Sequence, residues 1–129
     1  SLKEAVKELK GERIYVDVWA TWCSPCKKEF KYNVAFYDLL KSEGISMLYL
    51  SVDKEDREKQ WKDMINYYDL EGYHIRVNEK LYSDLKNLRG DDSFGIPWHI
   101  LIDNNGSIIK KYVSGPSEIE KLKEQLNEN

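Results

Sequence analysis

The feature that most constrains the fold of this 129-residue chain is a switch from a strand pattern to a helix pattern. Residues 14–20 (IYVDVWA) are apolar, β-branched or aromatic apart from one acid, which is typical of a buried strand. Residues 27–41 are charged, with apolar residues at helical spacing. Between them, residues 22–26 (WCSPC) contain both cysteines of the chain. The sequence therefore predicts that a strand ends, and a helix begins, at a Cys-x-x-Cys pair, which is the pattern of a dithiol redox site.

The predicted helix start gives each cysteine a chemical role. Cys23 would lie at the helix N-terminus, where unpaired N–H groups and the helix dipole stabilise an anion. Such a placement lowers the pKa of a thiol from ~8.5 towards ~7 or below, which favours the nucleophilic thiolate. Cys26 lies one turn later on roughly the same face and can close a disulfide with Cys23. We therefore predict Cys23 as the nucleophile and Cys26 as the resolving thiol, with Pro25 in the first helical turn.

A metal half-site and an inert pair are the alternatives for these cysteines. A structural zinc site needs four ligands. The further candidates of the usual kind, His74 and His99, lack a partner pair at zinc-finger spacing. We therefore favour the redox pair, and predict that the chain needs no metal and no cofactor.

Length and composition indicate one globular domain covering residues 1–129. Hydrophobic residues make up 41% and aromatic residues 12%, which excludes a disordered chain. The net charge of −3 comes from interspersed acids and bases, so we expect no binding of nucleic acid, and we expect a monomer. The sequence contains no apolar run that could span a bilayer and no signal peptide. Because it begins with Ser1, a membrane tether outside this sequence stays an open alternative.

The first half of the chain predicts a βαβ unit, which is almost always right-handed. Residues 45–52 are nearly all apolar, as in a strand covered on both faces of a parallel sheet. The helix between the strands is expected to end near Gly44 and to bury Phe30, Val34, Tyr37 and Leu40. A short helix is expected before the first strand, with Leu2, Ala5, Val6 and Leu9 on its apolar face.

The second half predicts a ββα unit after a less regular segment. That segment carries a helical stripe (Trp61, Met64, Ile65 and Tyr68), an extended piece at 73–77, a short helix around 81–88 and a loop at 90–92. Strands are expected at 98–102 and 107–113, joined by a turn in which Asn105 and Gly106 have positive φ. A last helix follows, with a capping box formed by Ser117 and Glu120. The fold class is therefore α/β, with one mixed central sheet and helices on both faces.

Two motifs resemble the thioredoxin superfamily over roughly residues 12–126. Residues 16–27 (VDVWATWCSPCK) closely resemble its active-site stretch, and Gly95-Ile96-Pro97 resembles its cis-proline element. Three features are most similar to the extracytoplasmic TlpA/ResA-like thiol-disulfide oxidoreductases: Glu29, the strand end Ser51-Val52-Asp53 before a tryptophan-bearing helix, and the hairpin motif at 101–106. The resemblance implies the thioredoxin fold.

The resemblance also implies roles for residues around the cysteines. Asp17 would accept the proton of Cys26, through water, as a mixed disulfide is resolved; the alternative is an edge-strand acid that points into solvent. A cis peptide bond at Pro97 would expose the backbone of Ile96 to an extended substrate. Trp22 would form an exposed apolar docking surface. The candidate substrate-binding residues are Trp22, Ser24, Pro25, Ile96 and Pro97.

The implied activity is thiol–disulfide exchange through a mixed disulfide with a partner protein, in an extracytoplasmic (periplasmic) location. An upstream dithiol protein would recharge the site. We favour reduction over oxidation, because Ser24-Pro25 lacks the histidine that stabilises the thiolate in the oxidising relatives. Two alternatives are a thiol peroxidase, whose Pro-x-x-x-Thr-x-x-Cys pattern is missing, and a redox-silent binding module.

For four further residues, a structural role is the alternative to a functional one. Glu29 could tune the dithiol, although a helical charged run is by default a solvated face. Trp19 is expected to be a packing residue. His74 and His99 are expected to be non-catalytic, and His99 is expected to be a hydrogen-bonded histidine within a strand.

Overall fold

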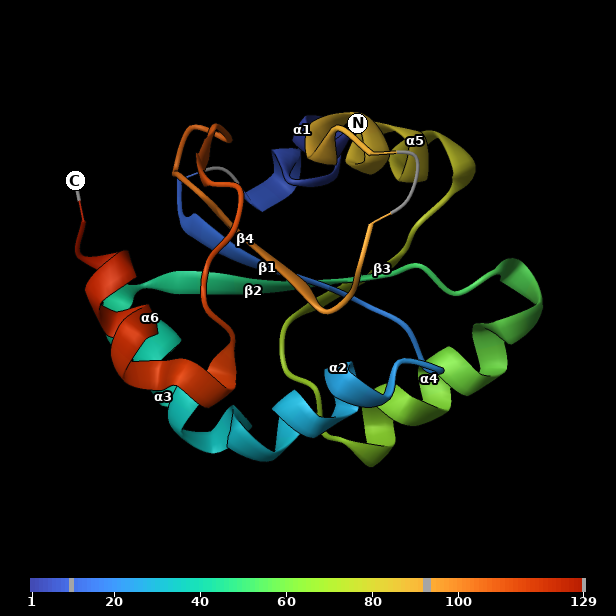
Figure 1. Cartoon of the computed structure of the whole chain (residues 1–129), viewed down its shortest axis with the longest axis horizontal. Coiled ribbons are helices and arrows are strands. Elements are labelled where there is room, and N and C mark those ends of the chain that lie inside the picture. Colours follow the sequence, from blue (N-terminus) through green and yellow to red (C-terminus); the bar gives the residue numbers. More distant parts are fainter. Residues whose placement is uncertain (10, 92–93, 129) are drawn as a thin grey trace.

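The strand predicted at residues 14–20 forms the centre of a five-stranded sheet with strand order β3-β2-β1-β4-β5 (Figure 1). This computed structural model describes residues 1–9, 11–91 and 94–128, so Asp92 of the predicted loop lies outside the described residues. β1 (Arg13–Trp19) pairs in parallel with β2 (Ile45–Ser51) and antiparallel with β4 (Trp98–Ile102). At the two edges, β3 (Tyr73–Arg76) lies parallel to β2 and β5 (Ile108–Lys110) antiparallel to β4.

Helices cover both faces of this sheet, as predicted (Figure 1). One face carries α1 (Leu2–Ala5) and α5 (Glu79–Arg89). The other carries α2 (Ser24–Glu29), α3 (Asn33–Glu43), α4 (Glu58–Tyr67) and α6 (Ile119–Leu126). Short 3₁₀ turns lie at Lys7–Leu9, Phe30–Tyr32, Glu55–Arg57 and Pro116–Glu118. The mixed sheet of βαβ and ββα halves is therefore confirmed, and the extended piece near residue 75 adds a parallel edge strand to it.

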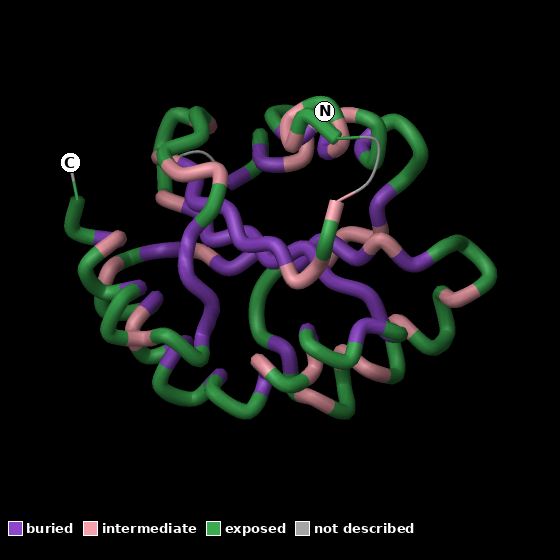
Figure 2. The backbone as a smooth tube through the Cα atoms, in the orientation of Figure 1, coloured by how far each residue is buried: buried purple, intermediate pink, exposed green. Residues whose placement is uncertain are grey.

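Side chains of β1 alternate between two buried clusters, because successive residues of a strand point to opposite faces. Ile14, Val16 and Val18 belong to the cluster beneath α1 and α5. Tyr15 and Trp19 belong to the cluster that contains both cysteines and residues of α3 and α6. Asp17 lies between Tyr15 and Trp19 in this alternation, so its side chain faces the cysteine layer. Figure 2 shows how completely the central strands are buried.

The helix after Cys23 is not continuous, and this changes which residues are buried. The 3₁₀ turn at Phe30–Tyr32 separates α2 from α3. A 3₁₀ turn has three residues per turn rather than 3.6, so it shifts the phase of the helix that follows. The prediction that Val34 is buried is therefore wrong, since its side chain is 80% exposed. The buried residues of α3 are Asn33, Phe36, Tyr37 and Leu40.

Two predicted local motifs are replaced by side-chain contacts. In the turn before β5, Gly106 has a positive φ but Asn105 does not; the carboxylate of Asp103 accepts the N–H groups of Asn105 and Ser107 instead. The capping box at Ser117 is absent, because α6 begins only at residue 119 and its N-cap makes no side-chain hydrogen bond. The N–H group of Ser117 instead donates to the carboxylate of Glu29, at 3.0 Å.

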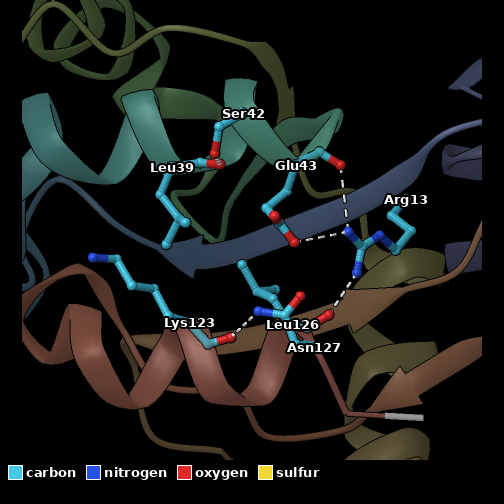
Figure 3. A network of polar contacts seen from close by, with 7 residues as sticks. All are labelled: Arg13, Leu39, Ser42, Glu43, Lys123, Leu126 and Asn127. Atoms are coloured by element: carbon cyan, nitrogen blue, oxygen red, sulfur yellow. Dashed lines mark hydrogen bonds and ion pairs between the residues drawn. The ribbon is translucent and has the colours of Figure 1, made fainter.

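Arg13, at the start of β1, ties together the C-terminal ends of two helices (Figure 3). Its Nη1 donates to the carbonyl of Leu126 in α6 at 2.8 Å. Its Nη2 donates to the carbonyl of Glu43 in α3 at 3.3 Å and to the Glu43 carboxylate at 3.4 Å. Carbonyls at a helix C-terminus have no partner within the helix, and the helix dipole favours a cation there. Asn127 satisfies another such carbonyl, that of Lys123, at 2.8 Å (Figure 3).

We predict that Arg13→Gln lowers the free energy of unfolding by about 1–2 kcal/mol, since it removes charge-assisted hydrogen bonds in a partly buried setting. Urea denaturation measures this. The matched control is Lys59→Gln, whose ion pair with Asp63 is 2.8 Å long but whose side chain is 85% exposed. This control should change stability little. An equal decrease in the free energy of unfolding in both variants would show that Arg13 contributes no more than an exposed surface cation.

Candidate active site

Cys23 and Cys26 form a disulfide at the N-terminus of α2. Cys23 is the N-cap residue: its backbone is extended, and its Sγ accepts the N–H group of Cys26 at 3.2 Å. Pro25 occupies the first turn, where its missing N–H leaves no helical hydrogen bond unmade. Cys23 is 4% exposed and Cys26 1% exposed, so the first sulfur is the one nearer the surface. The predicted disulfide at a helix start is therefore confirmed, and a backbone amide is directed at the sulfur of Cys23.

A buried carboxylate holds the loop that leads into this helix. Asp53, directly after β2, is 1% exposed. It accepts the N–H of Thr21 at 3.0 Å, the hydroxyl of Thr21 at 2.7 Å and the hydroxyl of Ser51 at 2.6 Å. Arg57 donates to the Thr21 hydroxyl from the other side, at 3.0 Å. These hydrogen bonds hold the loop at Thr21 in place, and this loop leads directly to Cys23 at the N-terminus of α2.

Of the five candidate substrate-binding residues, two line one groove, one lines a separate hollow and two line neither. Trp22, whose side chain is 61% exposed, lines the same groove as Ile96, together with Val52, Arg76, Tyr82 and Phe94. The peptide bond between Ile96 and Pro97 is cis. Ser24 lines a separate hollow with Lys27, Lys28, Phe30, Lys31 and Tyr68. Neither hollow is lined by Pro25 or Pro97.

Asp17 is buried on the central strand, with only 2% of its surface exposed, and does not lie at a sheet edge. It pairs across the antiparallel register with His99 of β4, and His99 Nε2 lies 3.7 Å from Asp17 Oδ1. Tyr15, two residues earlier, donates its hydroxyl to the carbonyl of Ser114 at 2.8 Å. Burial raises the pKa of Tyr15 well above its ordinary value, and the nearby carboxylates of Asp17 and Glu29 raise it further.

Three residues around Asp17 were missed or undervalued from the sequence. His99 was expected to be hydrogen-bonded, yet its Nε2 has no hydrogen-bond partner among the described residues. Glu29 is half-buried and bonded to Ser117 rather than lying on a fully solvated face. Gly115 lies against both His99 and Glu29. The sequence signals were the acid within an apolar strand and the TlpA/ResA-like Glu29; the pairing of Asp17 with His99 depends on strand register, which no local pattern specifies. Trp19 is fully buried, as expected of a packing residue.

No cluster of three side chains able to hold a metal ion occurs among residues 1–9, 11–91 and 94–128. Within the same described residues, none of the helices has the length and apolar character needed to cross a membrane.

The sheet order, the helix layers and a disulfide at the start of α2 define a thioredoxin-fold domain. The chain belongs to the Redoxin family, whose model matches residues 4–126. A similar protein is the thiol-disulfide oxidoreductase ResA of Bacillus cereus, 30% identical over 125 residues. That match covers 96% of this chain and 65% of the relative, so the chain spans just under two thirds of the relative's length.

Solved structures agree with this assignment. The thioredoxin domain of a thiol-disulfide oxidoreductase from Bacteroides vulgatus is 26% identical, with a TM-score of 0.75 over 95% of this chain and 84% of that one. A thiol:disulfide interchange protein from a Bacteroides species is also 26% identical, with a TM-score of 0.74 over 95% of this chain and 78% of that one. The predicted resemblance to the thioredoxin superfamily, and to its TlpA/ResA-like members, is therefore confirmed.

We predict that Asp53→Asn lowers the free energy of unfolding by about 2–3 kcal/mol, because an amide cannot accept all of the hydrogen bonds that the buried carboxylate accepts. Urea denaturation of the oxidised protein measures the loss. Asp63→Asn is the matched control, since Asp63 is exposed and pairs only with exposed Lys59 among the ion pairs of the described residues. An Asp53 variant as stable as the control would mean that the network does not hold the loop.

Proposed function

We propose that this domain is a thiol-disulfide oxidoreductase that reduces disulfides in partner proteins. The observation that carries the proposal is the cysteine pair at the start of α2, with the amide of Cys26 directed at the sulfur of Cys23. Once the disulfide is reduced, the same amide and the helix dipole stabilise a negative charge on that sulfur. The similar proteins from Bacillus cereus and Bacteroides vulgatus are thiol-disulfide oxidoreductases, which supports the same chemistry.

The proposed reaction runs in two exchanges. The Cys23 thiolate attacks one sulfur of a disulfide in the partner, forming a mixed disulfide and releasing the partner's other sulfur as a thiolate. Cys26 then loses its proton and attacks the sulfur of Cys23. The bond between Cys23 and the partner breaks, and the partner leaves with both of its sulfurs reduced. The two electrons it gains come from the pair, which ends as the Cys23–Cys26 disulfide, so an upstream dithiol donor must reduce the domain again.

The sequence between the cysteines supports the reducing direction. Reference potentials run from about −270 mV for thioredoxin to about −120 mV for the oxidant DsbA, a gap worth about 7 kcal/mol. A more stable thiolate makes a stronger oxidant, because it stabilises the reduced form. Ser24-Pro25 supplies no additional cation or histidine to the thiolate. We therefore place the potential of the pair nearer to that of thioredoxin.

The groove beside the pair is the proposed docking site for a partner polypeptide. Trp22 and Ile96 line it, and an extended segment lying there would contact Trp22, the residue directly before Cys23. Pro97 would present the backbone of Ile96 to that segment, and Ser24 and Pro25, which lie outside this groove, would contact the partner where it extends over the start of α2. The TlpA/ResA-like character supports an extracytoplasmic, periplasmic location. We propose a monomer in which a membrane tether, where present, lies outside this sequence.

We predict that Cys26→Ser accumulates a covalent adduct with a disulfide-containing protein such as insulin, because the resolving thiol is gone. Non-reducing electrophoresis and mass spectrometry detect the adduct, and reductant releases it. Cys23→Ser is the matched control and should form none, because Cys26 is the more deeply buried sulfur. Peroxide consumption without an adduct would instead identify a thiol peroxidase, and absence of both activities would identify a binding module.

We also predict that the potential of the pair, measured at equilibrium in a dithiothreitol buffer, lies closer to about −270 mV than to about −120 mV. Tryptophan fluorescence can follow the titration, since Trp22 adjoins the pair. A potential near the upper value would reverse the proposed direction while leaving the exchange chemistry intact.

A further inference from the structure

On the side of the sheet that carries the cysteines lies a buried polar pair that the two-cysteine mechanism does not by itself explain. Asp17 is 2% exposed and His99 8% exposed, and Asp17 Oδ1 and His99 Nε2 lie 3.7 Å apart. Neither atom has a hydrogen-bond partner within the part of the chain that the structure describes. Buried polar atoms are nearly always paired, because leaving one unsatisfied is costly. An acid and an imidazole kept in this arrangement therefore call for a functional explanation.

The far side of the imidazole leads towards the surface through Gly115. The backbone of Gly115 is extended (φ −83°, ψ 177°), a conformation that any residue adopts. A Cβ at this position would nevertheless lie 2.5 Å from Glu29 Oε1, 2.8 Å from His99 Cε1 and 3.2 Å from His99 Nδ1. Because Gly115 has no side chain, the Glu29 carboxylate and the His99 imidazole can both lie close to the place that a Cβ would occupy. Glu29 is half-buried, so the line from Asp17 through His99 to Glu29 ends at solvent.

We propose that His99 and Glu29 connect the buried carboxylate of Asp17 to solvent and carry away the proton that Cys26 loses when the mixed disulfide is resolved. The inference rests on the proposed function. The alternation along β1 turns Asp17 to the layer that contains Cys26. The titratable groups that face His99 are Asp17 and Tyr15 from β1 and Glu29 from α2. The Tyr15 hydroxyl is committed to the carbonyl of Ser114 and does not compete for this proton.

The proton released in the resolving step passes through the protein to bulk water. The Cys26 thiol gives its proton, through water, to the Asp17 carboxylate as its sulfur bonds to Cys23 and the partner leaves as a thiolate. Asp17 passes the proton to Nε2 of His99, and the proton on Nδ1 leaves towards Glu29 and then water. A neutral imidazole can accept at one nitrogen and donate from the other. When the upstream donor reduces the pair again, the same path runs inward and restores the original tautomer.

A chromogenic aromatic disulfide separates the two exchanges in a stopped-flow experiment on the reduced protein. The first coloured thiol is released when Cys23 attacks, at a rate proportional to reagent concentration. The second is released when Cys26 resolves the adduct, at a rate independent of that concentration. His99→Gln retains an amide that can hydrogen-bond to Asp17 but cannot relay a proton. We expect it to slow the second phase by about tenfold or more at pH 6.5, as for loss of general acid–base assistance, and to leave the first phase unchanged.

The pH profile distinguishes a relay from a structural role. The loss in His99→Gln should shrink as pH rises and disappear above about pH 9, where an ordinary thiol ionises without help. Glu29→Gln should give the same profile. Gly115→Ala should also give it, because the added methyl group separates Glu29 from His99 while both titratable groups remain. The matched control is His74→Gln, a half-buried histidine that bonds to the carbonyl of Leu70 and stacks on Tyr49; it should change neither phase.

Two results would overturn the relay. An unchanged second phase in His99→Gln shows that no proton passes through this residue. A loss of equal size at every pH, accompanied by a lower melting temperature, shows that the histidine acts only in packing. Absence of the first phase in the unmodified protein is a different outcome, because it removes the proposed function itself.

Discussion

The buried central strand must end so that a sulfur, rather than an ordinary capping side chain, occupies the N-cap position of a helix. The strand brings the chain to Ala20, and the carboxylate of Asp53 fixes the backbone and hydroxyl of Thr21. Cys23 then takes the N-cap position and accepts the amide of Cys26. Because both cysteines lie between the sheet and the surface, the second sulfur is protected while the first borders the exposed Trp22. We propose that these different surroundings give two chemically identical groups different roles in the exchange.

The layer beneath the disulfide is more polar than a purely structural core requires. Tyr15, Asp17 and His99 lie there, and Glu29 connects the layer to the surface. Burying such polar groups costs free energy unless they are paired. The opposite face of β1 differs, because there Ile14, Val16 and Val18 pack in an apolar cluster with residues of α1 and α5. The two faces of β1 thus differ in kind. Both faces carry buried apolar clusters that stabilise the fold, and we propose that the polar groups on the cysteine side exchange protons with the pair.

The cysteine site and the sheet could be predicted because their signals are local. The apolar runs at 14–20 and 45–52 and the single cysteine pair identify two parallel strands and the helix start between them. One error arose from a local turn that the pattern did not predict, and another arose where a distant contact replaced a local one. Val34 is exposed because a 3₁₀ turn shifts the helix phase, and the Ser117 amide bonds to Glu29, far away in sequence, instead of forming a capping box. The pairing of Asp17 with His99 follows from strand register alone, which explains why the histidine looked like an ordinary strand residue.

The proposed exchange requires that the start of α2 stabilises a thiolate at Cys23. The most direct test is the rate at which iodoacetamide alkylates Cys23 in the reduced protein, followed from acid to alkaline pH, with mass spectrometry identifying the modified residue. The same measurement in denaturant supplies the reference for an unstructured thiol, near pH 8.5. We expect the pH midpoint of Cys23 alkylation in the folded protein to lie clearly below that of the unstructured thiol, with Cys26 unmodified over the same pH range. A folded-state midpoint equal to the reference would contradict it.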